Sequence, residues 1–147
     1  MNRSIRFAAA AALTAILVAP TALAREDAVQ ISVQYVKDNA DQSKVLQNIS
    51  WHMNGAKHRG VAERYNLAAT TKSTNAAFKS DEAACSRAFL SAIIQLQTAA
   101  RNMGADGVVD IKSNAAGQSY EKSDNFLCTA GNILARVSLT GIPVKFK

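Results

Sequence analysis

Two histidines, His52 and His58, are the only imidazoles of this 147-residue chain, so any imidazole base or imidazole metal site must use them. A hydrolase needs such a base beside a nucleophile and an orienting carboxylate, but no serine here has the G-x-S-x-G context. The five residues between the two histidines match neither the helical H-x-x-x-H spacing nor a zinc-finger spacing, although a strand and a loop could still bring the rings together. We therefore expect no enzymatic activity, with a metal-binding module and a small hydrolase as the alternatives.

Carboxylates are present but not arranged in a recognisable pair. The acids best placed for paired acid and base chemistry are Asp106, Asp110, Glu121 and Asp124, and their spacing singles out no two of them. We expect all four to be solvated surface groups, and we expect no cofactor.

The chain has two cysteines, Cys85 and Cys128, and they do not form a C-x-x-C redox motif. An even count in an exported protein is most simply a structural disulfide, and a loop of this length gives about 4 kcal/mol of stabilisation by the chain-entropy formula. We expect this disulfide to contribute much of the stability of a small domain.

Export itself is predicted by residues 1–24. Arg3 and Arg6 precede the apolar run 7–18, and Ala22 and Ala24 supply the small residues that a signal peptidase reads. No later stretch approaches the roughly 20 apolar residues of a membrane helix. We expect cleavage near Ala24 and a single periplasmic or secreted domain over residues 25–147.

Charge argues for binding to an anionic target. Of 17 Lys and Arg residues, Arg3 and Arg6 leave with the leader, so 15 face 11 Asp and Glu residues and the net charge falls from +6 to +4. This is too little, without a recognisable module, for nucleic-acid binding. The densest basic stretch, opposed only by Glu63, consists of Lys57, His58, Arg59, Arg64, Lys72 and Lys79. We predict that Lys57, Arg59 and Arg64 bind an anionic envelope component, such as lipopolysaccharide or phospholipid, or a partner protein.

The first half of the mature chain reads mainly as strands. Alternating apolar residues predict one strand over residues 29–35 and a second over residues 45–53, with Trp51 pointing inward. The polar segment 57–78 is either a further strand or a long extended connection.

The clearest element is a helix between Ser80, a good N-cap, and Gly104, a left-handed C-cap. Its apolar stripe predicts a core-facing side. The stripe consists of Cys85, Phe89, Ala92, Leu96, Ala99 and Met103. Arg87, Gln95, Gln97 and Arg101 lie off its centre.

The chain after Gly104 predicts a strand over residues 108–112, with Val109 and Ile111 on one face, and then a mobile connection over residues 113–123. A short strand follows with Phe126 and Cys128 on one face. A last strand begins at Ile133 and breaks at residues 141–143 before residues 144–146. The expected architecture is α+β, with one main helix packed on a mostly antiparallel sheet and clamped to it by Cys85 and Cys128.

Several segments of the second half occur in a specific order. They are DEAAC (81–85), AFLSA (88–92), GADGVVDIKS (104–113), Phe126, Cys128, Gly131 and VSLTG (137–141). From about Trp51 onward, this order resembles a family of small exported bacterial proteins. Many members of that family are named after the ATPase subunit of the excinuclease ABC. That name implies an ATPase phosphate loop, G-x-x-x-x-G-K-[ST], which this chain does not contain.

A more distant similarity concerns the helix, the GA-[DN]-x-V-V strand and the cysteine-bearing strand. Their order is similar to that in RcsF-like envelope-stress sensors and in the YbjQ group of heavy-metal-binding domains. The resemblance implies a helix against a sheet and a role in envelope stress or homeostasis. The RcsF-like proteins are anchored by a lipid on an N-terminal cysteine, whereas Arg25 stands at the predicted mature N-terminus here.

Overall fold

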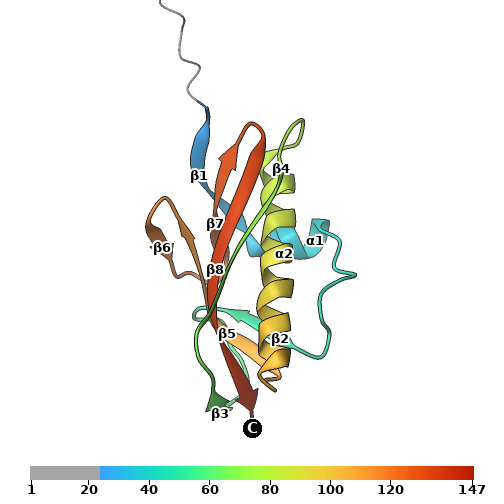
Figure 1. Cartoon of the computed structure of the whole chain (residues 1–147), viewed down its shortest axis with the longest axis vertical. Helices are drawn as coiled ribbons and strands as arrows, with labels where there is room; N and C mark the ends of the chain where they lie inside the picture. Colours follow the sequence, from blue (N-terminus) through green and yellow to red (C-terminus); the bar gives the residue numbers. More distant parts are fainter. Residues whose placement is uncertain (1–23) are drawn as a thin grey trace, which may run out of the picture.

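The computed structural model describes residues 24–147, in which one long helix lies against a twisted and mostly antiparallel sheet (Figure 1). The predicted leader, residues 1–24, lies outside the described residues apart from Ala24. The two helices are α1 (Val33–Asn39) and α2 (Asp81–Asn102). The strands are β1 (Glu26–Ser32), β2 (Ser50–Met53), β3 (Val61–Arg64), β4 (Ala68–Asn75), β5 (Gly107–Ala115), β6 (Gln118–Tyr120), β7 (Asn125–Gly131) and β8 (Leu134–Phe146). The predicted α+β class is confirmed.

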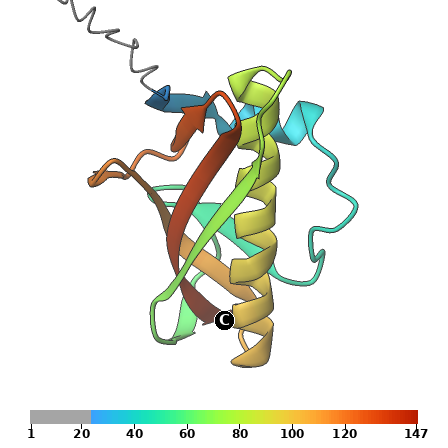
Figure 2. The same ribbon diagram turned by 45° about the horizontal axis from the view of Figure 1, so that its top comes forward.

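Strand β8 organises the sheet because it is the longest and pairs with four others. Strands β4 and β3 follow one another along one of its edges, while β7 and β5 follow one another along the other. Strand β1 then pairs with β7, β6 pairs with β5, and β2 pairs with β5 as the one parallel neighbour among the described strands. The helix α2 crosses one face of this sheet, and the opposite face, called the outer face below, is left uncovered by it (Figure 2).

The long helix begins and ends where the sequence predicts. The Ser80 hydroxyl accepts a hydrogen bond from the Ala83 amide, and Asp81 and Glu82 occupy the first turn, where the helix dipole favours negative charge. After the C-cap, Gly104 has φ +77, the left-handed conformation that glycine adopts without strain.

The apolar stripe is confirmed at its centre and wrong at its end. Cys85, Phe89 and Leu96 are buried, but Met103 is 41% exposed. Gln97, predicted off the stripe, is fully buried. Its amide donates to the carbonyls of Leu46 (2.9 Å) and Ile49 (2.5 Å) and accepts from the Leu46 amide (3.0 Å), so it satisfies backbone groups of the loop before β2.

The predicted disulfide is confirmed and joins α2 to β7. Cys85 and Cys128 are both fully buried, with their Cα atoms 5.9 Å apart. One helical turn further on, the Phe89 ring stacks on Phe126 of the same strand at 4.1 Å, and Trp51 meets Phe89 edge-on at 5.8 Å. The disulfide therefore lies within the main core, and the predicted inward orientation of Trp51 is confirmed.

Near the N-terminus the predicted strand 29–35 is wrong beyond Ser32. The Ser32 hydroxyl accepts from the Tyr35 amide and caps α1, whose Val33 and Val36 are buried. Val33 and Val36 are three residues apart, a spacing that places both side chains on one face of a helix. This segment therefore forms α1 and does not continue the predicted strand. The second predicted strand is also too long, since only Ser50–Met53 pairs and the loop before it is held by Gln97 instead.

Two connections predicted in the sequence are structured. Segment 57–78 contains β3 and β4, which both pair with β8. The predicted mobile connection 113–123 is wrong, because β5 runs on to Ala115 and turns through Ala116 and Gly117, both at positive φ, into β6. A two-residue turn with φ above zero is the geometry that a β-hairpin prefers.

The predicted break at residues 141–143 is also wrong, because β8 runs unbroken to Phe146. A Cβ on Gly141 would lie 2.7 Å from Val108 and 3.5 Å from Leu96 of α2, so only glycine lets the strand pass beneath the helix. Pro143 has no amide hydrogen, but its carbonyl accepts from Tyr65 at 2.9 Å.

A β-bulge in β5 separates two residues expected on one face. The register with β8 shifts between Val109 and Lys112, and Asp110 adopts φ +52 at that shift. Ile111 consequently joins the main core beneath α2, while Val109 joins a second cluster with Val144 and Phe146. The bulge therefore creates a second, buried apolar cluster on the side of the sheet away from α2.

Candidate functional site

The second apolar cluster lies where β2, β3, β5 and β8 meet at one end of the sheet. Because Gly141 faces α2, the alternation of β8 turns Ile142, Val144 and Phe146 to the outer face. Val61 of β3 packs against them. This end is close to the last described residue, which lies beside β3 (Figure 1).

Three polar side chains gather around the Phe146 ring. The rings of His52 and His58 each lie 6.0 Å from it, centroid to centroid, and 5.6 Å from each other. The Arg59 guanidinium lies over the Phe146 ring at 4.7 Å, within the range of a cation–π interaction. We call these four residues the Phe146 cluster.

Local sequence explains how the cluster forms. Trp51 and Met53 face the core, so His52 between them projects to the outer face. A Cβ on Gly107 would lie 2.3 Å from the Phe146 ring, so the ring rests on a backbone that only glycine leaves open. The Lys147 amide donates to the Gly60 carbonyl at 2.9 Å, which holds the 58–60 loop against the end of β8.

The electrostatics of the cluster leave Arg59 as its permanent charge. Burial lowers the pKa of His52, and the nearby His58 is the next cause, with Lys37 and Arg59 adding smaller effects in the same direction. His52 is therefore neutral at neutral pH. Arg59 is exposed and belongs to no ion pair within residues 24–147, so its charge is available to a ligand.

The structure places the three predicted binding residues differently. Lys57 and Arg59 are exposed on the loop between β2 and β3. Arg64 lies on β3 opposite Val144, on the outer face, but its guanidinium pairs with the Asp110 carboxylate at 2.9 Å. Its charge is already partly compensated, so Arg59 and Lys57 are the two predicted residues with uncommitted charge in the described chain.

The remainder of the basic stretch is dispersed. Lys72 on β4 pairs with Val137, whose side chain is buried beneath α2, so Lys72 lies on the face opposite the Phe146 cluster. Lys79 is exposed just before α2, at the helix end far from β3 (Figure 1). The sequence neighbourhood of six basic residues is thus not one surface patch.

The structure meets only one requirement of the alternative function, a metal site at the two histidines. His52 and His58 do converge from a strand and a loop, as that alternative requires. Across residues 24–147, however, no group of three or more His, Cys, Asp or Glu side chains is arranged to hold a metal ion. The Arg59 cation nearby also opposes a second positive charge.

In the described chain, the hydrogen bonds and ion pairs around the site hold the fold together and do not link a base to a nucleophile. The His58 Nδ1 atom is 2.7 Å from the Arg59 carbonyl, and neither histidine bonds a serine or carboxylate there. Among the candidate carboxylates, Asp106 accepts from the Phe146 amide at 3.0 Å, Asp110 pairs with Arg64, and Glu121 pairs with Lys112. The arrangement is suited to binding an anionic group beside an aromatic ring.

Phe146 is the member of this surface that the sequence did not indicate, whereas Asp110, expected as a solvated surface acid, is paired with Arg64. Comparison of the chain with protein-family models, curated proteins and solved structures found no match. No helix formed by residues 24–147 has the length and apolar character needed to cross a membrane. The alternation of residues 142–146 could have indicated that Phe146 faces outward, but no sequence signal links it to His52 or Arg59, which are far away along the chain.

Proposed function

We propose that this chain, once exported and freed from its leader near Ala24, is a non-enzymatic periplasmic protein of envelope stress or homeostasis. It binds an anionic envelope component, or a partner protein with an acidic surface, through the Phe146 cluster. The observation that carries the proposal is the exposed Arg59 guanidinium, held over the Phe146 ring without an ion-pair partner in the described chain.

The geometry supports a preorganised cation. An exposed arginine normally loses rotamer freedom when it binds, and an aromatic platform that already orders the guanidinium reduces that loss. The planar guanidinium presents paired N–H donors that match phosphate and carboxylate groups. Lys57 on the same loop adds a second exposed cation.

The test measures binding of the mature protein to anionic vesicles and to lipopolysaccharide by co-sedimentation, at low and high salt. A cation close to an anionic surface is worth about 1 kcal/mol, so charge reversal in Arg59→Glu should cost about 2 kcal/mol, or about 30-fold in affinity. Added salt should weaken wild-type binding. Arg64→Glu should have a smaller direct effect, because that guanidinium is already paired with Asp110.

The matched control is Arg101→Glu, the same charge change at an exposed arginine in the last turn of α2. It should leave binding close to wild type. Equal losses of affinity in the Arg59 and Arg101 variants would mean that only the net charge of the protein matters. That result would contradict a site at the Phe146 cluster.

A second candidate function is metal binding, favoured by the 5.6 Å separation of the His52 and His58 rings. Titration of the oxidised protein with Zn²⁺ or Cu²⁺, followed through the two imidazoles by NMR, tests it. If the chain binds metal at the two histidines, binding should be saturable and His58→Ala should abolish it. Wild-type binding no tighter than that of the His58→Ala variant would contradict this candidate.

A further inference from the structure

Strand β4 presents a regular free edge to solvent. All eight of its residues pair with β8, from Ala68 opposite Gly141 to Asn75 opposite Leu134, without a register shift. No described strand pairs with its other edge. A regular edge without proline or bulge offers unpaired N–H and C=O groups to another extended chain.

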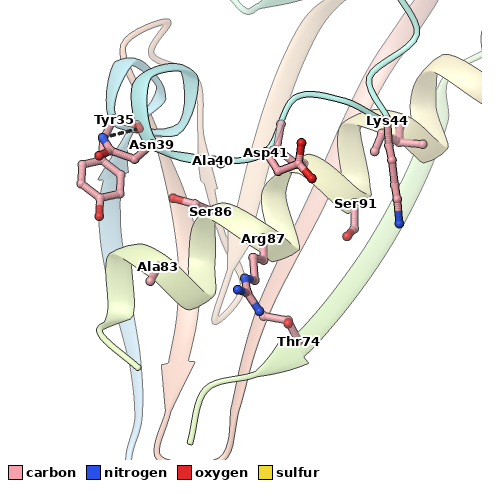
Figure 3. Close-up of a pocket in the computed structure, with 12 residues that line it drawn as sticks. Tyr35, Asn39, Ala40, Asp41, Lys44, Thr74, Ala83, Ser86, Arg87 and Ser91 are labelled. Atoms are coloured by element: carbon pink, nitrogen blue, oxygen red, sulfur yellow. Dashed lines mark hydrogen bonds between the residues drawn. The ribbon is translucent and has the colours of Figure 1, made fainter. Parts of the chain in front are cut away.

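A groove lies beside this edge, along the exposed side of α2 (Figure 3). It has a volume of about 570 Å³ and lies between Thr74 of β4 and the segment after α1 that carries Asp41 and Lys44. Its floor extends along α2 from Ala83 to Ile94. At 1.5 Å per helical residue this is about 16 Å, room for about five residues of extended chain.

The charges around the groove favour an acidic occupant. Arg87 of α2 and Lys44 line it, and neither belongs to an ion pair within the described residues. Lys72 lies on the same face of β4 as Thr74, because their partners Val137 and Ala135 are both core residues. Against these three cations stands Asp41, whose carboxylate accepts from the Ser43 amide at 2.9 Å; this bond and the nearby Lys44 lower its pKa, so it keeps its negative charge and offsets part of the Lys44 charge. Arg87 and Lys72 therefore carry the preference for an acidic occupant.

An unpartnered hydroxyl marks the floor of the groove. Ser86 is 3% exposed, and its Oγ has no hydrogen-bond partner in the described structure. Figure 3 shows this side chain directed toward Asn39 and Ala40 at one end of the groove. A buried hydroxyl without a partner is costly, and a carbonyl of a bound chain would supply one.

We propose that the β4 edge and the groove beside α2 bind an extended acidic peptide segment of a partner protein, which adds to the sheet as a further strand. Backbone hydrogen bonds to β4 supply affinity, and alternate side chains of the peptide reach Arg87 and Lys72. Strand β1 is the other long edge, where Asp27 is paired with Arg25 and Glu26, which has no ion pair among the described residues, repels an acidic chain. The site is separate from the Phe146 cluster.

The test is an amide NMR titration of the mature protein with capped peptides as long as β4. The first peptide alternates glutamate and valine, the second replaces each glutamate by glutamine, and the third carries two central prolines that cannot join a ladder. The acidic peptide should shift residues 68–75 and the groove and slow amide exchange in β4. Arg87→Glu and Lys72→Glu should each weaken binding about fivefold, the effect of one exposed ion pair.

A matched variant separates the outcomes. Arg101→Glu should bind the acidic peptide at β4 as the wild type does. Absence of shifts at millimolar peptide, equal binding of the glutamine or proline peptide, or shifts confined to β1 would each overturn the proposal. Because Arg59 is not involved, such a failure leaves the Phe146 cluster proposal standing.

Discussion

Replacement of Gln97 by methionine tests whether the side chain of Gln97 holds the loop before β2 in place. The fully buried Gln97 amide makes three hydrogen bonds to backbone groups of Leu46 and Ile49. Methionine fills a similar volume but leaves the Leu46 amide without its acceptor and the Ile49 carbonyl without this donor, while the Leu46 carbonyl keeps its bond from the Ile49 amide at 3.3 Å. An orphaned buried group costs about 1–3 kcal/mol, and the Ile49 carbonyl can partly recover a bond to water, so we expect a loss of about 3 kcal/mol.

The assay is urea unfolding of the oxidised mature protein, with the melting temperature as a second readout. A domain of this size loses about 4 °C per kcal/mol, so the melting temperature should fall by about 12 °C. Gln95→Met, an exposed position on the same helix, should stay within about 0.5 kcal/mol of wild type. A Gln97→Met protein as stable as the Gln95→Met control would show that the hydrogen bonds of Gln97 do not stabilise the loop before β2.

Three further predictions concern stability. Replacing Cys85 and Cys128 by serine should lower the unfolding free energy by up to about 4 kcal/mol with similar secondary structure by circular dichroism; two reactive thiols in unfolded, periplasmically produced protein would contradict this. Gly107→Ala should cost about 1–3 kcal/mol in urea unfolding, because its Cβ displaces the Phe146 ring, and unchanged ring contacts by NMR would count against it. Because burial holds the pKa of His52 below 6.5 in the folded state, the unfolded chain gains the proton first, so stability should be complete above pH 6.5 and fall on acidification. Urea midpoints of His52→Gln should depend less on pH, and identical profiles would show that His52 is not responsible.

Local signals in the sequence were sufficient for the helix and its attachment to the sheet. Ser80 and Gly104 delimit α2 because capping chemistry acts within a few residues, and Cys85 and Phe89 fall on the buried side because helical periodicity determines it. Because the chain has two cysteines, Cys85–Cys128 is the one intramolecular disulfide that it can form.

What could not be predicted depends on contacts distant in sequence. Gln97 is polar in a helix, and only the loop that folds over it explains its burial. The bulge at Asp110 has no local signature, yet it moves Val109 away from Ile111 and so produces the second buried cluster on the side of the sheet away from α2. The predicted break after Gly141 failed because the strand's pairing with β3 and β5 outweighs the local preference of proline.

The candidate site was predicted only in part. Arg59 was singled out by its basic neighbourhood, whereas the Phe146 ring beneath it comes from the far end of the chain. Arg64 was grouped with Arg59 by sequence distance, and only the fold shows that Asp110 compensates it.

The most direct test of the central claim is crosslinking of the tagged mature protein in its native envelope, comparing wild type with Arg59→Glu and Arg101→Glu at low and high salt. If the chain binds through the Phe146 cluster, one dominant crosslinked species should form that high salt and Arg59→Glu remove and Arg101→Glu retains. A species that persists in the Arg59 variant and in high salt would contradict binding through the Phe146 cluster.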